Sequence, residues 1–286
     1  MSSKKTPKKI KINKPKVMIL SGYGLNCEEE TKFAFERAGG IGEIVHINDL
    51  IAKPKMLGEF QILAFPGGFS YGDDTGSGKA YANKLKNHLG KEINEFLSRD
   101  TLAIGICNGF QIMTNLGILP GALTHNKNAQ YIDRWVDLAI PSSPAKGRVG
   151  RGFSPWLVGI KKISLPIAHG EGRYLIDSKK YKEMLKKKEI AFTYTKGDIC
   201  KFQNLEANPN GANYDIAGIL GYNGRVLGMM PHPERAQFFH HSPLWQLKKK
   251  DPFDRFDKLT ASKQRARKDE GEGLILFKNA INYFRK

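Results

Sequence analysis

The stretch LAIGICNGFQIMTNL at residues 102–116 contains a short apolar run, a polar turn between two glycines and a second apolar run. The first run, 102–106, is unbroken and ends at a turn signal, as expected of a buried strand. The second run, 109–116, is apolar at helical spacing and indicates a helix. The stretch therefore predicts a strand, a sharp turn and a helix in immediate succession, which is the repeating unit of an α/β sheet.

Segments on the amino-terminal side repeat this alternation. We expect strands at 16–20, 42–47 and 60–65, and helices at about 27–37 and 79–97. Because strands that alternate with helices pair in parallel, the pattern predicts an α/β fold with a doubly wound, mostly parallel sheet. Side chains that perform chemistry should then lie at the carboxyl ends of the strands.

The pattern changes after residue 130, where apolar runs become more closely spaced. Asn223 and Gly224 stand between two such runs, and this pair is a strong signal for a tight hairpin turn. The sheet should therefore gain antiparallel strands in this half, and residues 231–235 should follow a hairpin strand. The expected strands are 135–140, 163–168, 191–195, 216–222 and 225–230, and a closing helix is expected at 274–284.

Length and charge indicate how the chain is organised. Its 286 residues suffice for one large core, so we predict a single domain at 16–286, with a basic tail at 1–15 and a charged insertion at about 240–271. The net charge is +18, and it falls to +11 without the seven lysines of residues 1–16. The basic runs lack interleaved aromatic residues and a nucleic-acid motif, so we expect solvated surfaces and no nucleic-acid partner.

The cysteines and the apolar segments bear on the compartment. Cys27, Cys107 and Cys200 are odd in number and lack metal-ligand spacing, which argues against disulfides and against a zinc site. The uncharged run 101–126 could span a membrane by length, but its glycines, proline and amides favour a buried strand and helix. No secretory signal pattern is visible. We therefore expect a cytoplasmic protein without metal or membrane span, with Cys27 and Cys200 in packing roles.

The motif GICNG at 105–109 places a cysteine where a strand turns sharply into a helix. This is the context of a nucleophile elbow of the G-x-S-x-G type, with cysteine in place of serine. The helix amino terminus favours a thiolate at Cys107, because its free N–H groups and dipole stabilise negative charge. Taken alone, the motif would equally fit a buried structural cysteine.

Two further segments favour the catalytic interpretation. His232 and Glu234 stand on either side of a proline, so both side chains can project to one side and Glu234 can orient His232. With Cys107 they supply a nucleophile, a proton shuttle and an orienting group. The motif PGGFSYGD at 66–73 follows a predicted strand, so the N–H groups of its glycines, with that of Asn108, are placed to hold an oxyanion.

Four segments match the motifs of one enzyme family in their order, their spacing and the identity of their residues. They are GGFSYGD at 67–73, GICNGFQ at 105–111, HGEGR at 169–173 and MMPHPER at 229–235. Over roughly residues 16–238 and the last helix, the chain resembles the triad-type class I glutamine amidotransferases, and among them the glutaminases of phosphoribosylformylglycinamidine synthase in purine biosynthesis. It departs from the short form of that family in the lysine tail, at 141–162 and at 240–271.

The resemblance implies a fold, an activity and site residues. The fold would be flavodoxin-like, and the activity would be hydrolysis of glutamine to glutamate and ammonia. The implied catalytic residues are Cys107, His232 and Glu234. The implied oxyanion or substrate contacts are Gly67, Gly68, Asn108 and Gln111, and the implied substrate or interface contacts are Ser70, Glu171 and Arg173.

The resemblance also implies partners. The ammonia would pass to a synthetase subunit that uses ATP and magnesium to convert phosphoribosylformylglycinamide into its amidine. A small third subunit is expected in the complex. This chain itself should need no cofactor, and glutamine would be its small-molecule substrate.

Two alternatives remain open from the sequence. An amidotransferase that supplies ammonia for CTP or GMP synthesis would share the triad but not the residues found here at 67–73 and 169–173. A non-enzymatic binding module would act through the basic tail and retain the fold as a scaffold, although an intact Cys107, His232 and Glu234 argue against it.

Overall fold

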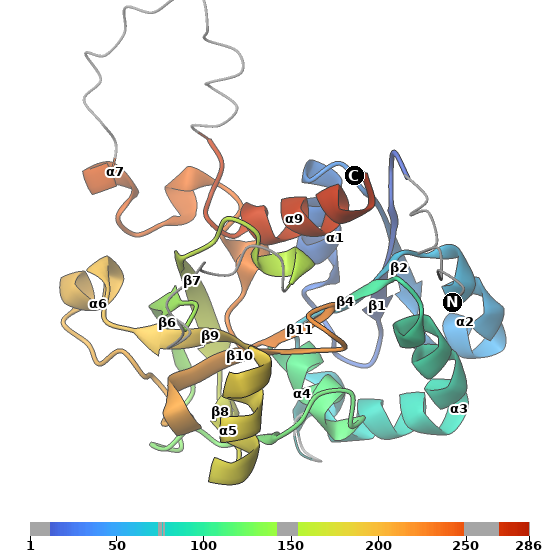
Figure 1. Ribbon diagram of the computed structural model, residues 1–286, viewed down its shortest axis with the longest axis horizontal. Coiled ribbons are helices and arrows are strands. Elements are labelled where there is room, and N and C mark those ends of the chain that lie inside the picture. Colours follow the sequence, from blue (N-terminus) through green and yellow to red (C-terminus); the bar gives the residue numbers. More distant parts are fainter. Residues whose placement is uncertain (1–11, 74–75, 77, 142–153, 249–268, 286) are drawn as a thin grey trace, which may run out of the picture.

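The architecture is a nine-stranded sheet with helices on both faces (Figure 1). The computed structural model describes residues 12–73, 76, 78–141, 154–248 and 269–285. The strands of the large sheet, in spatial order, are β2 (Ile41–His46), β1 (Lys16–Ser21), β3 (Ile62–Phe65), β4 (Leu102–Ile106), β11 (Val226–Met229), β10 (Ile216–Gly221), β9 (Ile190–Thr195), β6 (Ile132–Ala139) and β7 (Lys162–His169). A separate ribbon pairs β5 (Ala122–Thr124) with β8 (Arg173–Leu175).

The large sheet consists of a parallel half and an antiparallel half. β2, β1, β3, β4 and β11 run parallel to one another. β10 precedes β11 through a tight turn in which Asn223 and Gly224 both have positive φ, and β9, β6 and β7 continue the sheet in antiparallel pairs. The predicted parallel sheet with added antiparallel strands and the predicted hairpin are therefore confirmed.

Helices cover both faces of the parallel half (Figure 1). α1 (Glu28–Arg37) packs with α9 (Leu274–Arg285) on one face, and α3 (Lys79–Ser98) packs with α4 (Asn108–Asn115) on the other. The other α-helices of the described residues are α2 (Ile47–Ala52), α5 (Ser178–Lys187), α6 (Asp198–Gln203) and α7 (Trp245–Lys248). In the described part of the chain, no helix combines the length and apolarity that crossing a membrane requires.

The predicted elements agree with the observed ones to within a few residues. The uncharged run 101–126 forms β4, α4 and β5, as the strand-and-helix interpretation required. The sequence patterns missed short or polar elements, namely α2, α5, α6, α7, β5 and β8. α5 lies in a lysine-rich run that we expected to be solvated surface, and it buries only Met184.

Parts of three predicted segments lie outside the described residues. These parts are 1–11 of the basic tail, 142–153 in the stretch that departs from the family, and 249–268 of the charged insertion. The described flanks of the insertion meet each other, because Phe238 and Glu270 form an isolated β-bridge.

The first turn of α4 lies directly against β3, and a glycine makes this approach possible. A Cβ atom added at Gly109 would lie 1.9 Å from the carbonyl oxygen of Phe65. Backbone atoms cannot yield at this distance, because Phe65 is itself part of the sheet. The second glycine of the 105–109 motif therefore sets how closely the helix packs on the strand.

We predict that Gly109→Ala lowers the free energy of unfolding by about 3 kcal/mol or more, because the added methyl group overlaps the Phe65 carbonyl. The matched control is Gly90→Ala in α3, where an added Cβ meets nothing within 4 Å. That control should gain about 0.5–1 kcal/mol, since alanine favours a helix interior. Urea unfolding of both variants measures the contrast, and equal stabilities would contradict the packing argument.

Candidate active site

Cys107 lies at the carboxyl end of β4 in a strained backbone conformation. Its φ is 50° and its ψ is −107°, and residues with side chains rarely adopt a positive φ. Its N–H donates to the carbonyl of Met229 at 2.8 Å, which fixes the turn to β11. Its thiol lies 3.7 Å from the carbonyl oxygen of Ala168 and is directed at it. The strand, sharp turn and helix predicted at 102–116 are therefore confirmed.

His232 and Glu234 form a buried pair beside this turn. They lie in and next to the 3-10 helix Pro233–Arg235, and Nδ1 of His232 donates to Oε1 of Glu234 at 2.6 Å. Both side chains are almost fully buried. Because Nδ1 carries the shared proton, Nε2 is left for other partners. It makes no regular hydrogen bond among the described residues, although the Cys107 and Cys27 side chains interact with the imidazole. The backbone of His232 is held in turn by the carbonyl of Pro166 on β7, 2.8 Å away.

The environment of His232 favours its charged form. Burial acts to lower the pKa of His232, but the charges of Glu234 and Cys107 outweigh burial and hold the pKa well above its ordinary value. A protonated imidazole beside a cysteine stabilises a thiolate. His232 thus carries a proton that it can donate, beside a cysteine and a carboxylate.

A chain of side-chain amides ties the glycine loop to the elbow. The N–H of Ser70 donates to Oδ1 of Asn108 at 3.2 Å, and Nδ2 of Asn108 donates to Oε1 of Gln111 at 2.7 Å. Nε2 of Gln111 then donates to the carbonyl of Glu171 at 2.7 Å. Four of the residues singled out in the sequence are therefore connected in one row.

Gly67 and Gly68 lie where the loop passes closest to other parts of the site. A Cβ at Gly67 would lie 2.8 Å from Cε1 of His232, and one at Gly68 would lie 2.6 Å from the Gly24 carbonyl oxygen. The Gly67 carbonyl accepts from the N–H groups of Asn26 and Cys27, both at 3.2 Å. Glycine is required here because the loop touches both the imidazole and the turn after β1.

Glu171 and Arg173 separate in the structure. The Glu171 side chain is 16% exposed and its carboxylate lies 3.5 Å from Nδ1 of His125. Arg173 lies on β8, and its Nε donates to the Gly211 carbonyl at 3.2 Å. Glu171 therefore belongs to the row that leads to Cys107, whereas Arg173 is held by the loop before β10.

His169 is a second buried imidazole that the sequence patterns assigned no role of its own. Oδ1 of Asn126 accepts the N–H of Gly172 at 3.0 Å and lies 3.1 Å from Nδ1 of His169. Because this oxygen only accepts, Nδ1 of His169 carries the proton and Nε2 is a bare acceptor without a partner among the described residues. Burial lowers the pKa of His169 to about 3, and the nearby charge of His232 adds to the effect.

The sequence predicted packing roles for Cys27 and Cys200, and the structure agrees for Cys200 but shows a further contact for Cys27. Cys200 is buried on α6 and its thiol is directed at the Thr195 carbonyl, 3.7 Å away. Cys27 was expected to pack only, yet its sulfur accepts from Nη2 of Arg235 at 3.0 Å and lies beside His232. The available signal was its position after the turn that follows β1, at the same sheet edge as Cys107.

Among the described residues, one cavity touches the pair and another lies further along β7. A cavity of about 460 Å³ is lined by His232, Glu234 and Arg235 together with Asp133 and Trp135. The imidazole of His232 and the guanidinium of Arg235 both form part of its wall.

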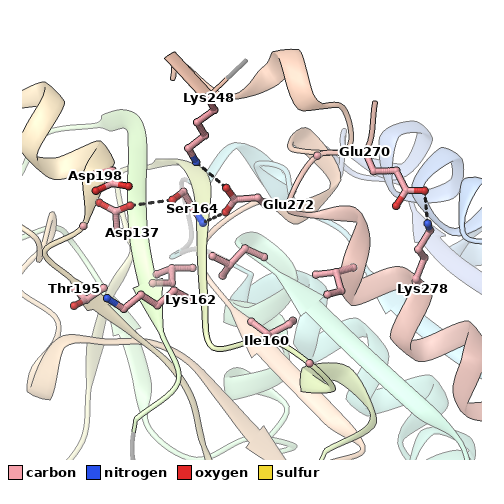
Figure 2. Close-up of a pocket in the computed structure, with 16 residues that line it drawn as sticks. Asp137, Ile160, Lys162, Ser164, Thr195, Asp198, Lys248, Glu270, Glu272 and Lys278 are labelled. Atoms are coloured by element: carbon pink, nitrogen blue, oxygen red, sulfur yellow. Dashed lines mark hydrogen bonds and ion pairs between the residues drawn. The ribbon is translucent and has the colours of Figure 1, made fainter. Parts of the chain in front are cut away.

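The other cavity, of about 740 Å³, lies at the amino end of β7, whereas Cys107 contacts the carboxyl end of that strand (Figure 2). Figure 2 shows that several of its charged groups are paired with protein groups: Lys248 bonds Glu272, Lys278 bonds Glu270, and Asp137 accepts from Ser164. This cavity is therefore a polar junction of β6, β7, α6 and α9, and no chemistry is assigned to it.

The fold and the elbow define a glutamine amidotransferase, and comparison with known proteins agrees. Residues 14–284 match the family described as CobB/CobQ-like glutamine amidotransferase domain. A Methanococcus maripaludis protein, phosphoribosylformylglycinamidine synthase subunit PurQ, is 46% identical over 95% of this chain and 99% of its own length. The subunit of the same name from Dehalococcoides mccartyi is 40% identical over 96% of this chain and 100% of its own.

A solved structure supports the same family. A chain of PurLQS from Thermotoga maritima aligns with a TM-score of 0.66 and 29% identity over 94% of this chain and 99% of that chain. This chain belongs to the PurQ family of phosphoribosylformylglycinamidine synthase subunits. The resemblance seen in the four sequence segments is thereby confirmed.

The neutral His169 predicts a pH dependence of stability. Its folded pKa of about 3 lies below the value of about 6.5 in an unfolded chain, so the unfolded state binds the extra proton between these values. The contribution of neutral His169 is therefore complete above about pH 6.5 and is lost as the pH falls towards 3.

Replacement by asparagine tests this dependence, because its amide can still donate to Asn126. Relative to His169→Asn, the wild-type free energy of unfolding should fall by about 1.4 kcal/mol per pH unit below about pH 6.5. Urea unfolding at several pH values gives the difference, and His88→Asn on the exposed side of α3 is the control. A wild-type advantage that does not change with pH would show that His169 is not held neutral.

Proposed function

We propose that this chain hydrolyses glutamine to glutamate and ammonia with Cys107 as nucleophile, and that it supplies the ammonia to a synthetase subunit. The observation that carries the proposal is the 2.6 Å hydrogen bond from His232 to Glu234, buried beside a cysteine on a strained elbow. This arrangement orients the imidazole and leaves Nε2 free for proton transfer.

The reaction follows from these charges. The Cys107 thiolate attacks the carboxamide carbon of glutamine, and the carbon–nitrogen bond breaks as His232 gives its proton to the departing ammonia. The product is a thioester between Cys107 and the glutamyl group. Water, activated by the now neutral His232, hydrolyses the thioester, releases glutamate and restores the thiolate.

Backbone N–H groups at the elbow would stabilise the oxyanion. In the described part of the chain, the N–H groups of Gly68 and Asn108 donate to no protein acceptor. The loop that carries Gly68 is joined to the elbow, because the N–H of Ser70 donates to Oδ1 of Asn108. Each donor of this kind is worth roughly 10²- to 10³-fold in rate.

The polar row beside the elbow would bind the rest of the substrate. The hydroxyl of Ser70 is buried and has no partner within the described residues, which suits it to a substrate contact. Gln111 is engaged with Asn108 and Glu171, so we assign it to holding the pocket. The carboxylate of Glu171, which lies 3.5 Å from Nδ1 of His125, would meet the α-ammonium group of glutamine.

The relatives indicate the destination of the ammonia. They are subunits of phosphoribosylformylglycinamidine synthase, and the Thermotoga maritima structure is a PurLQS complex. We propose that this chain serves the same synthase, that a synthetase partner binds the ATP and magnesium, and that a small third subunit completes the complex. Phe69 and Tyr131, 41% and 54% exposed with ring centres 6.2 Å apart, offer this partner an aromatic contact near the elbow.

The first test replaces the nucleophile. In a complex with the synthetase subunit, Cys107→Ala should reduce glutamate release from glutamine by about 10³-fold or more, because no other group forms the thioester. Cys200→Ala is the matched control, a buried cysteine on α6 whose loss should leave the rate unchanged. Glutamate is measured by a coupled dehydrogenase assay, and a Cys107→Ala complex with wild-type activity would refute the proposal. Synthesis from free ammonia should persist in the variant.

The second test removes the charge that orients His232. Glu234→Gln keeps the shape but offers an amide to Nδ1, so the imidazole adopts the wrong tautomer or loses its orientation. We expect kcat to fall by about 10²- to 10⁴-fold with a smaller change in KM. An unaffected kcat would mean that His232 does not depend on Glu234.

A further inference from the structure

A cysteine and an arginine lie on the far side of the His232–Glu234 pair. The Cys27 sulfur, a ring nitrogen of His232 and a carboxylate oxygen of Glu234 lie within 4.8 Å of one another, and all three side chains are buried. A Cβ at Gly67 would lie 3.1 Å from the Cys27 sulfur and 2.8 Å from Cε1 of His232. The bare glycine therefore lets the sulfur face the edge of the imidazole.

The cation that faces this cluster is the guanidinium of Arg235. Its Nη2 donates to the Cys27 sulfur at 3.0 Å, and its Nε lies 3.9 Å from Oε1 of Glu234, the same oxygen that accepts from His232. The guanidinium thus spans two acceptors that come from different elements, the amino end of α1 and the 3-10 helix Pro233–Arg235. Its planar arrangement of fixed donors is suited to hold two groups at once.

The carboxylate of Glu234 depends on these contacts for its orientation. Its second oxygen, Oε2, has no hydrogen-bond partner among the described residues. The neighbouring Gln237 bonds the backbone carbonyl of Glu234 at 2.8 Å and so fixes the main chain, not the carboxylate. What restrains the carboxylate is therefore His232 on one side and the positive charge of Arg235 on the other.

We propose that Arg235 and Cys27 act together as positioning residues for the proton shuttle. Arg235 keeps the Glu234 carboxylate directed at Nδ1 of His232, and Cys27 keeps Arg235 from turning out to solvent, where 38% of its side chain is already exposed. Neither residue contacts the substrate in this scheme. The inference rests on the proposed glutaminase function and adds two residues that position its proton shuttle.

The cavity behind His232 makes a chemical test possible. Arg235 lines the cavity of about 460 Å³, so its removal leaves a space that opens to this cavity and can admit a free guanidinium ion. A free ion restores a charge at that place but does not repair a misfolded chain. Rescue by added guanidinium therefore separates positioning from a general structural role.

The experiment measures glutamate release by the complex with its synthetase subunit. Arg235→Ala should lower kcat by about 10- to 100-fold with little change in KM for glutamine, as expected for a group that orients a catalytic residue. Millimolar guanidinium, far below denaturing concentrations, should restore part of kcat. Methylammonium should not, because it lacks the planar donors. Arg235→Lys should lie between the wild type and the alanine variant.

Two further variants keep the test decisive. Cys27→Ser retains a hydrogen-bond acceptor and should keep most of the activity, whereas Cys27→Ala should lose several-fold in kcat and show less than an additive loss when combined with Arg235→Ala. Arg285→Ala, which removes an arginine bonded to the carbonyls of Asn13 and Gly39, is the control for guanidinium effects elsewhere.

The outcomes separate the two proposals. An active wild-type complex whose Arg235 variants retain full kcat, or lose it without rescue by guanidinium, overturns the positioning role alone. A wild-type complex that releases no glutamate, or one that stays active after Cys107→Ala, overturns the glutaminase function itself. Should Arg235→Ala not fold, Arg235→Lys and the two Cys27 variants give the same decision.

Discussion

The ladder between β4 and β11 is the interaction on which the arrangement of the site depends. Ile106 pairs with Met229, and the N–H of Cys107 extends the ladder by donating to the Met229 carbonyl. The residues that follow these two strands are the elbow and the segment that carries His232. Because a parallel ladder fixes the offset of its strands, it sets how far apart the backbones of Cys107 and His232 lie before any side chain is placed.

Two buried imidazoles in this site are held in opposite states by their partners. His232 shares its Nδ1 proton with a carboxylate and has a raised pKa, whereas His169 donates to an amide oxygen and has a lowered one. Burial alone would keep both neutral. The difference is made by Glu234 and Cys107 beside His232, so charged neighbours decide which of the two imidazoles carries the extra proton.

Sequence reasoning placed the parallel strands, the elbow and the hairpin well, because each has a local cause. Apolar runs of strand length, paired glycines and Asn223-Gly224 report the backbone directly. It failed for α5 and α6, which are short and polar and which tertiary contacts hold in place. It also missed the roles of Cys27 and Asn126, because each acquires its partner from a segment far along the chain, Arg235 and His169 respectively.

The position of β11 in the chain has a consequence for synthesis on the ribosome. The elbow and the glycine loop belong to the first half of the sequence, yet the neighbouring edge of β4 is completed by a strand more than 100 residues later. Until that strand emerges, Cys107 has neither its backbone partner nor an imidazole beside it. The environment of Cys107 is therefore assembled late, when the sheet closes around a thiol that the ribosome released long before its neighbours.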